Sequence, residues 1–197
     1  MPVNKTLLGA ALAAAALLLA AASLPPTTLS LINTVTGDPL DLNDSLPDGR
    51  DTPAVKQFLQ SGYDPYVEVA SCFANGKSLF LTACSGCHGG EMEGKVGPNL
   101  GDDYWTYPVN TTDAGLFSTI FGGASGMMGP HNQDLTLDQI LRVMAWIRHH
   151  FNGPVAHATW LTPEKQKHFV PFTPADEAKT KDSEDASACK LPDTTTP

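Results

Sequence analysis

The sequence is poor in basic residues and in cysteine. Lysine and arginine number 12 in 197 residues, against 21 aspartates and glutamates, so the formal net charge is −9. This balance argues against nucleic acid as a partner, because such binding neutralises phosphates with Lys and Arg. An acidic surface suits solubility and steering toward a basic patch on another protein, and it is equally compatible with a solvated surface that serves no partner.

No apolar run reaches the roughly 20 residues that a transmembrane helix needs. The longest, Leu7 to Ala22, follows Lys5 and ends in three alanines, the pattern of an export signal with small residues at its cleavage site. No cysteine follows it directly, which argues against a lipid anchor. The alternative, a buried Ala-rich helix, is disfavoured because the stretch lies close behind the initiator Met. We predict that residues 1–22 are a signal peptide and that the mature protein is periplasmic, without a membrane span.

One motif, CSGCH at residues 84–88, carries most of the chemical information. Cys84 and Cys87 lie three positions apart on one turn and can bond to both vinyl groups of a haem, and His88 can then ligate the iron. A structural zinc site would need a second CxxC or a His pair, and a thioredoxin-like redox pair would need a βαβ context. The sequence has neither, so the motif predicts one covalent haem c, whose attachment outside the cytoplasm agrees with export.

The sixth position of an iron held by His88 decides between an electron carrier and a haem enzyme. Met127 and Met128 lie in the loop GASGMMGP, and a thioether ligand favours Fe(II) and raises the potential. Met128 is the preferred ligand because Gly-Pro follows it, with Met127 as the alternative and His131 as the rival; either methionine could instead fill a gap in the core. A methionine ligand predicts a carrier that is not an enzyme, whereas a mono-haem enzyme would need an exchangeable sixth ligand.

The mature length suits one all-α domain between two irregular extensions. Residues 69–152 form the predicted haem domain, with three main helices over Val69 to Ala83, Asp113 to Phe121 and Leu137 to Phe151. The extensions, residues 23–68 and 153–197, are rich in proline and turn signals, and the second is expected to wrap the core. They contain one short predicted helix, over Ala54 to Gln60.

Two local signals bear on the packing of these helices. Thr136 and Gln139 form a capping box at the start of the last helix. Gly76 weakens the first helix, and its missing Cβ predicts the close approach of another helix, for which the last helix is the candidate.

The strings GKSLFLTACSGCH, GPNL, a loop methionine and a final helix with MAWIR resemble the class I cytochrome c pattern over about residues 69–151. YWTYP at 104–108 and TDAGLFSTIFGGASGMMGP at 112–130 are more specifically similar to the cytochrome cL family. That resemblance implies a protein that accepts single electrons from a PQQ-dependent methanol dehydrogenase and passes them to a second cytochrome c. We also expect the protein to be a monomer. A carrier for a different dehydrogenase is the alternative.

The resemblance also bears on the surroundings of the haem. The far imidazole nitrogen of His88 needs an acceptor, and the backbone carbonyl of Pro98 in GPNL is expected to supply it. Some relatives hold Ca²⁺ near the haem, and Asp102, Asp103 and Asp113 offer oxygens. They form no EF-hand loop, and helix capping and a solvated loop are the favoured roles for them.

Two cysteines remain outside the haem motif, Cys72 and Cys189. In an oxidising compartment they are expected to form a disulfide that straps the polar C-terminal segment onto the core, the alternative being two free thiols.

Overall fold

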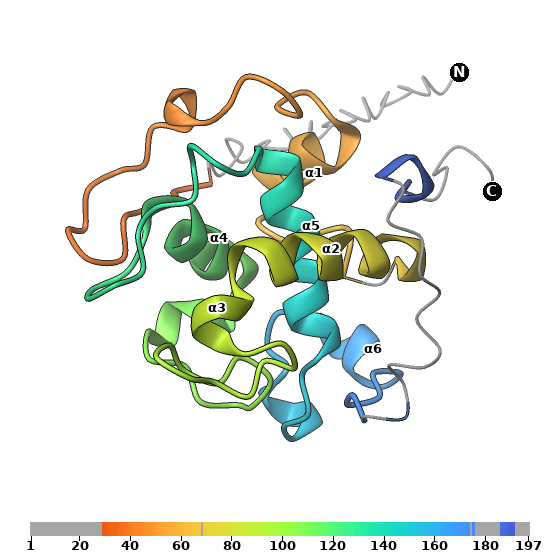
Figure 1. Cartoon of the computed structure of the whole chain (residues 1–197). Coiled ribbons are helices and arrows are strands. Elements are labelled where there is room, and N and C mark those ends of the chain that lie inside the picture. The colour runs from red at the N-terminus through yellow and green to blue at the C-terminus, as the bar shows by residue number, and fades with distance from the viewer. Residues whose placement is uncertain (1–28, 68, 174, 176–185, 192–197) are drawn as a thin grey trace, which may run out of the picture.

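The computed structural model describes residues 29–67, 69–173, 175 and 186–191 (Figure 1). The predicted signal peptide, residues 1–22, lies outside the described residues. Within them the chain is helical, and its extended pairing is limited to an isolated bridge between Ile32 and Pro39. In this part of the chain no helix has the length and apolar character needed to cross a membrane. The prediction of an all-α fold is confirmed.

Six α-helices are described, and four of them match the predicted spans to within two residues at each end. They are α1 (Pro53–Ser61), α2 (Ala70–Ala83), α3 (Ser85–His88), α4 (Asp113–Gly122), α5 (Leu137–His149) and α6 (Pro163–Gln166). Short 3-10 helices lie at Leu42–Asp44, Pro108–Thr111, Val155–His157 and Ala186–Ala188.

The predicted capping box at the start of α5 is present. Gln139 N donates to Thr136 Oγ1 at 3.2 Å, and Thr136 N donates to Gln139 Oε1 at 2.9 Å. These two bonds satisfy donors that a helix N-terminus otherwise leaves unpaired. α4 begins in a similar way, because the Thr112 side chain accepts a hydrogen bond from Gly115 N.

The helix crossing expected at Gly76 is the centre of the fold, where α2 runs across α5 (Figure 1). A Cβ on Gly76 would lie 2.3 Å from the backbone oxygen of Arg142 and 3.0 Å from Cβ of Trp146. Only a residue without a side chain allows the two backbones to approach this closely, so Gly76 fixes the distance between α2, which leads into the CSGCH motif, and the central helix α5.

Replacing Gly76 with alanine should therefore lower the free energy of unfolding by about 1–3 kcal/mol, the usual cost of overpacking. Chemical denaturation followed by circular dichroism measures this change. Thr82→Ala, on the exposed face of the same helix, is the matched control and should stay within about 0.5 kcal/mol of the wild type. Equal stabilities for Gly76→Ala and the wild type would show that the crossing tolerates a wider spacing.

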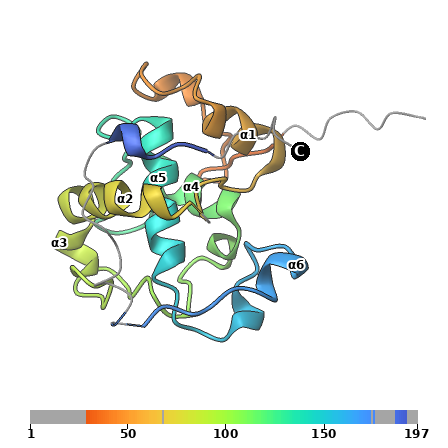
Figure 2. The same cartoon turned by 90° about the vertical axis from the view of Figure 1, so that its right-hand side faces the viewer.

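The N-terminal extension and residues 153–173 of the C-terminal extension pack on the helical core at opposite ends of α5 (Figure 2). α1 buries Val55 and Phe58, and the Phe58 ring lies 4.8 Å from that of Phe117 in α4. At the other end, Phe151 forms a second small cluster with residues of the C-terminal extension: Ala158, Trp160, Leu161 and Phe169. α1 thus belongs to the main core, although it lies in a segment predicted to be mostly irregular.

The expected disulfide between Cys72 and Cys189 is present. It joins α2 to the segment that follows Ala186–Ala188, and both cysteines are buried. In the chain-entropy model, closing a loop of this length stabilises the fold by about 4.7 kcal/mol. The disulfide attaches the C-terminal segment to the helix that leads into the haem motif.

Candidate haem site

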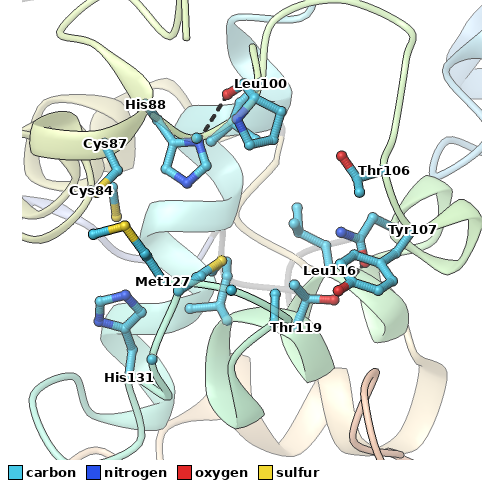
Figure 3. A pocket seen from close by; sticks show the side chains of 18 of the residues that line it. Cys84, Cys87, His88, Leu100, Thr106, Tyr107, Leu116, Thr119, Met127 and His131 are labelled. Atoms are coloured by element: carbon cyan, nitrogen blue, oxygen red, sulfur yellow. Dashed lines mark hydrogen bonds between the residues drawn. The ribbon is translucent and has the colours of Figure 1, made fainter. Parts of the chain in front are cut away.

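The CSGCH motif forms its own helical turn directly after α2. Cys84 N donates to Phe80 O at 2.8 Å, and His88 N donates to Cys84 O at 3.0 Å, so Cys84 caps both the end of α2 and the start of α3. This turn places Cys84, Cys87 and His88 along one wall of a cavity (Figure 3).

His88 is held by a loop that follows the motif. Its Nδ1 lies 2.9 Å from the backbone oxygen of Pro98, as expected from the sequence. A carbonyl oxygen can only accept, so Nδ1 carries the proton and Nε2 keeps its lone pair. His88 is 8% exposed, and its ring extends into the cavity with Nε2 available as a ligand (Figure 3).

Gly97 lets this loop approach the imidazole. A Cβ at Gly97 would lie 2.7 Å from His88 Cε1, closer than side-chain contacts allow. The loop is tied back to the motif because Gly97 N donates to Cys87 O at 2.9 Å. The GPN segment therefore fixes both the tautomer and the orientation of the ring.

The cavity has a volume of about 690 Å³, within the range of cofactor sites. Its inner wall is apolar, with Leu116 and Ile120 from α4, Ile147 from α5 and Trp105 from the preceding loop. Two thiols, an imidazole and two thioethers converge on this apolar volume. The residues present therefore fit a covalently bound haem.

Cys84 is a neutral thiol in this setting. Burial raises its pKa to about 12, and unfavourable charge interactions with Asp134 and Cys87 add to the effect. The side chain thus sits in the low-dielectric surroundings expected of a residue joined to an apolar macrocycle.

The methionine loop, residues 123–130, faces His88 across the cavity (Figure 3). Its two methionines differ: Met127 is 81% exposed, whereas Met128 is half-buried and packs against the main core. His131 follows the loop, also lines the cavity, and its Nδ1 lies 2.9 Å from Asp134 Oδ2. This arrangement supports Met128 as the ligand.

Polar groups line the side of the cavity away from the cysteines, a feature that the sequence did not predict. Tyr107 contacts Ser125 of the methionine loop through two hydrogen bonds, of 2.5 and 2.9 Å. Thr119 donates to Asn110 Oδ1 at 2.7 Å and also lies 2.8 Å from the Thr34 hydroxyl of the N-terminal extension. Tyr107 and Ser125 lie in loops, where no helical or strand periodicity indicates which side chains meet.

The roles expected for Asp113 are wrong. Instead of a solvated or calcium-binding carboxylate, it is 2% exposed and pairs with the fully buried Arg148, whose Nε lies 3.0 Å from Asp113 Oδ1. Arg148 also donates to Asn110 O at 2.9 Å and lies 4.2 Å from the ring centroid of Trp160. The pair ties α4 to α5 directly behind the cavity.

The other two candidate calcium ligands are engaged elsewhere. Asp103 Oδ2 lies 2.6 Å from His157 Nδ1, and Asp102 Oδ1 accepts from Tyr104 N at 3.0 Å. Across the residues that the structure describes, no group of three or more His, Cys, Asp or Glu side chains is arranged to hold a metal ion. The geometry gives no support to a calcium site.

Asp64, in the loop before α2, is a buried carboxylate beside this ion pair. Its Oδ1 accepts from Tyr66 N at 2.9 Å, while its Oδ2 is buried without a hydrogen-bond partner. Burial raises the pKa of Asp64 well above its usual value, and the charge of Asp113 raises it further; the Tyr66 N–H and Arg148 oppose the shift, and Asp138 adds to it. The folded state therefore favours protonated Asp64.

This raised pKa makes the protein lose stability as the pH rises from about 4 through the folded-state pKa of Asp64. Asp64→Asn keeps the acceptor for Tyr66 N and removes the charge, so we expect it to be more stable than the wild type at pH 8, by on the order of 1 kcal/mol, and no more stable near pH 4. Thermal unfolding across this range measures the difference. Asp41→Asn, at an exposed Asp with a similar backbone hydrogen bond, is the control. If the stability of Asp64→Asn changed with pH in parallel with that of the wild type, the raised pKa of Asp64 would be contradicted.

Comparisons with known proteins also indicate a c-type cytochrome. A family model described as cytochrome C oxidase, cbb3-type, subunit III matches residues 73–147, which contain both CSGCH and the methionine loop. The chain is 57% identical over 148 residues to cytochrome c-L of Methylorubrum extorquens strain AM1, covering 75% of each chain.

Two solved structures are similar in fold and sequence. The structure of cytochrome cL from Hyphomicrobium denitrificans matches with a TM-score of 0.70 and 58% identity, over 81% of this chain and 94% of that one. The structure of cytochrome cL from the marine methylotrophic bacterium Methylophaga aminisulfidivorans matches with a TM-score of 0.71 and 51% identity, over 75% of this chain and 99% of that one. The helical fold and the likeness to c-type cytochromes thus extend well beyond the haem motif.

Proposed function

Because the chain belongs to the cytochrome c-L family of c-type cytochromes, we propose that it is a periplasmic mono-haem electron carrier that accepts single electrons from a PQQ-dependent methanol dehydrogenase and passes them to another cytochrome c. The observation that carries the proposal is the convergence of one CSGCH motif and one methionine loop on a single apolar cavity. A single haem bound there supplies one iron that cycles between Fe(III) and Fe(II), and therefore one electron at each encounter.

Different residues of the chain would bind the haem, ligate its iron and set its redox potential. Cys84 and Cys87 would form the thioether bonds, and His88 would ligate through Nε2 while Pro98 O keeps the proton on Nδ1. Met128 would close the sixth position, which excludes substrates and favours Fe(II). Leu116, Ile120 and Ile147 would keep water from the inner face of the ring. We propose that the chain is a carrier and not an enzyme on these grounds.

Stopped-flow reduction by purified methanol dehydrogenases tests the donor. We expect rapid one-electron reduction by a calcium-dependent or a lanthanide-dependent enzyme, with a rate that falls as ionic strength rises, because an excess of carboxylates steers the encounter. Absence of reduction by both enzymes, while a chemical reductant still reduces the haem, would overturn the donor assignment. A rate insensitive to salt would contradict electrostatic steering.

Charge at the cavity mouth can be tested by a matched pair of variants. Asp134 is exposed at the edge of the cavity, and Asp38 is exposed in the N-terminal extension. If the donor docks at the cavity mouth, Asp134→Asn should slow the bimolecular rate at low salt several-fold, whereas Asp38→Asn should change it little. Equal effects of the two variants would place the dock elsewhere.

A further inference from the structure

Apart from Met128, which packs against the main core, most of the methionine loop lies at the surface. Ser125, Gly126, Met127, Gly129 and Pro130 are exposed. Gly123 and Gly126 adopt positive φ angles of 81° and 83°, and one backbone bond, from Ala124 N to Met128 O at 2.9 Å, closes the loop. A loop built in this way needs outside contacts if Met128 is to stay at one position in the cavity.

Tyr107 supplies such a contact from a different segment of the chain. Its phenol oxygen accepts a hydrogen bond from Ser125 N at 2.9 Å and lies 2.5 Å from Ser125 Oγ. Both bonds reach the loop three residues before Met128. Tyr107 and Ser125 also line the same cavity as Met128, so the contact lies at the site itself.

The segment that carries Tyr107 is itself fixed to the core. Asn110 N donates to Tyr107 O at 2.9 Å, and Asn110 O accepts from Arg148 Nη2 at 2.9 Å. Arg148 is fully buried in α5 and also lies 5.2 Å from the ring centroid of Trp105. A chain of contacts thus runs from the central helix through Asn110 and Tyr107 to Ser125.

We propose that Tyr107 is a positioning residue that clasps the methionine loop through Ser125 and so keeps the Met128 thioether on the haem iron. The proposal rests on the proposed function, because it takes Met128 as the sixth ligand. It adds a specific role for a residue outside the CSGCH motif and outside the methionine loop. Tyr107 sets how often the sixth coordination position opens, and thereby the stability of the Met-ligated form.

Tyr107→Phe in the holoprotein, with Tyr104→Phe as the control, tests the clasp. Tyr104 lies in the same segment, lines the same cavity and is 69% exposed. Loss of hydrogen bonds worth about 1.4 kcal/mol corresponds to a tenfold change in loop opening. We therefore expect carbon monoxide to bind reduced Tyr107→Phe about tenfold faster than the wild type. The long-wavelength absorption band of Met ligation should also be lost at a lower temperature, while global unfolding by circular dichroism changes little.

A second variant separates the clasp from a general loss of stability. Ser125→Ala removes the Oγ contact and should reproduce part of the effect, and the double variant should be less than additive, because both changes break the same contact. Equal carbon monoxide rates for Tyr107→Phe and Tyr104→Phe would overturn the proposal. A second combination of results would also overturn it: a shifted redox potential in Tyr107→Phe, an unaltered Met-ligation band, and no effect of Ser125→Ala. Tyr107 would then act on the edge of the haem and not on the methionine loop.

These readouts are independent of the donor. Failure of every methanol dehydrogenase to reduce the protein would overturn the proposed donor and leave a positive clasp result standing. A wild-type protein that lacks the Met-ligation band would remove the ligand assignment, and the clasp proposal with it.

Discussion

Replacing Met128 with alanine should open the sixth coordination position of the haem, whereas replacing Met127 should not. Met128 is half-buried against the core, and Met127 is 81% exposed. Without the thioether, the reduced protein should bind carbon monoxide readily and lose the absorption band of Met ligation. Its potential should fall by on the order of 0.1 V or more, since axial ligands set haem potentials over about 0.8 V. Redox titration and optical spectra of both variants measure these changes.

The same pair of variants decides between the candidate ligands. If Met127→Ala opened the iron and Met128→Ala did not, the ligand would be Met127, and the packing of Met128 would be purely structural. If neither did and His131→Ala did, a histidine would hold the sixth position. His131 already pairs with Asp134, so that outcome would require this contact to break.

Replacing Arg148 with methionine should lower the free energy of unfolding by about 3–5 kcal/mol, the usual cost of removing one partner of a buried ion pair. The methionine retains an unbranched apolar stem, so the cost arises chiefly from charge and hydrogen bonding. Asp113 would keep one hydrogen bond, from Asp64 N, and Asn110 O would lose its donor. Denaturant unfolding of the holoprotein, monitored by circular dichroism, measures the loss.

The double variant Arg148→Met with Asp113→Asn isolates the charge. It removes both charges of the pair, and it should recover a substantial part of the stability lost by Arg148→Met alone, since the uncompensated carboxylate is gone. A double variant no more stable than the single one would mean that Arg148 acts through its packing between Trp105 and Trp160 instead.

The sequence predicts those parts of the site that depend on local geometry. The CxxCH turn, the helix boundaries and the Thr136 capping box follow from residues within four positions of one another. Gly76 is an exception at longer range, because an isolated glycine in a helix indicates that another backbone approaches. The Pro98 contact spans ten residues, and its prediction relied in part on resemblance.

The polar contacts behind the cavity could not be predicted in the same way. Asp113 follows a Thr cap, and such a position usually faces solvent; its burial depends on Arg148, 35 residues away and on another helix. Tyr107 and Ser125 lie in two loops without periodicity, and their contact exists only after α4 has folded between them. Partners of this kind are selected by tertiary packing, which leaves no mark on local spacing.

The optical spectrum of the purified native protein, followed by addition of carbon monoxide to the reduced form, tests the central claim most directly. An electron carrier with one covalent haem held by His88 and Met128 should show a c-type spectrum, the long-wavelength band of Met ligation in the oxidised state, and slow or absent carbon monoxide binding when reduced. A c-type spectrum without that band, together with rapid carbon monoxide binding, would contradict the carrier and indicate a haem with an exchangeable sixth ligand.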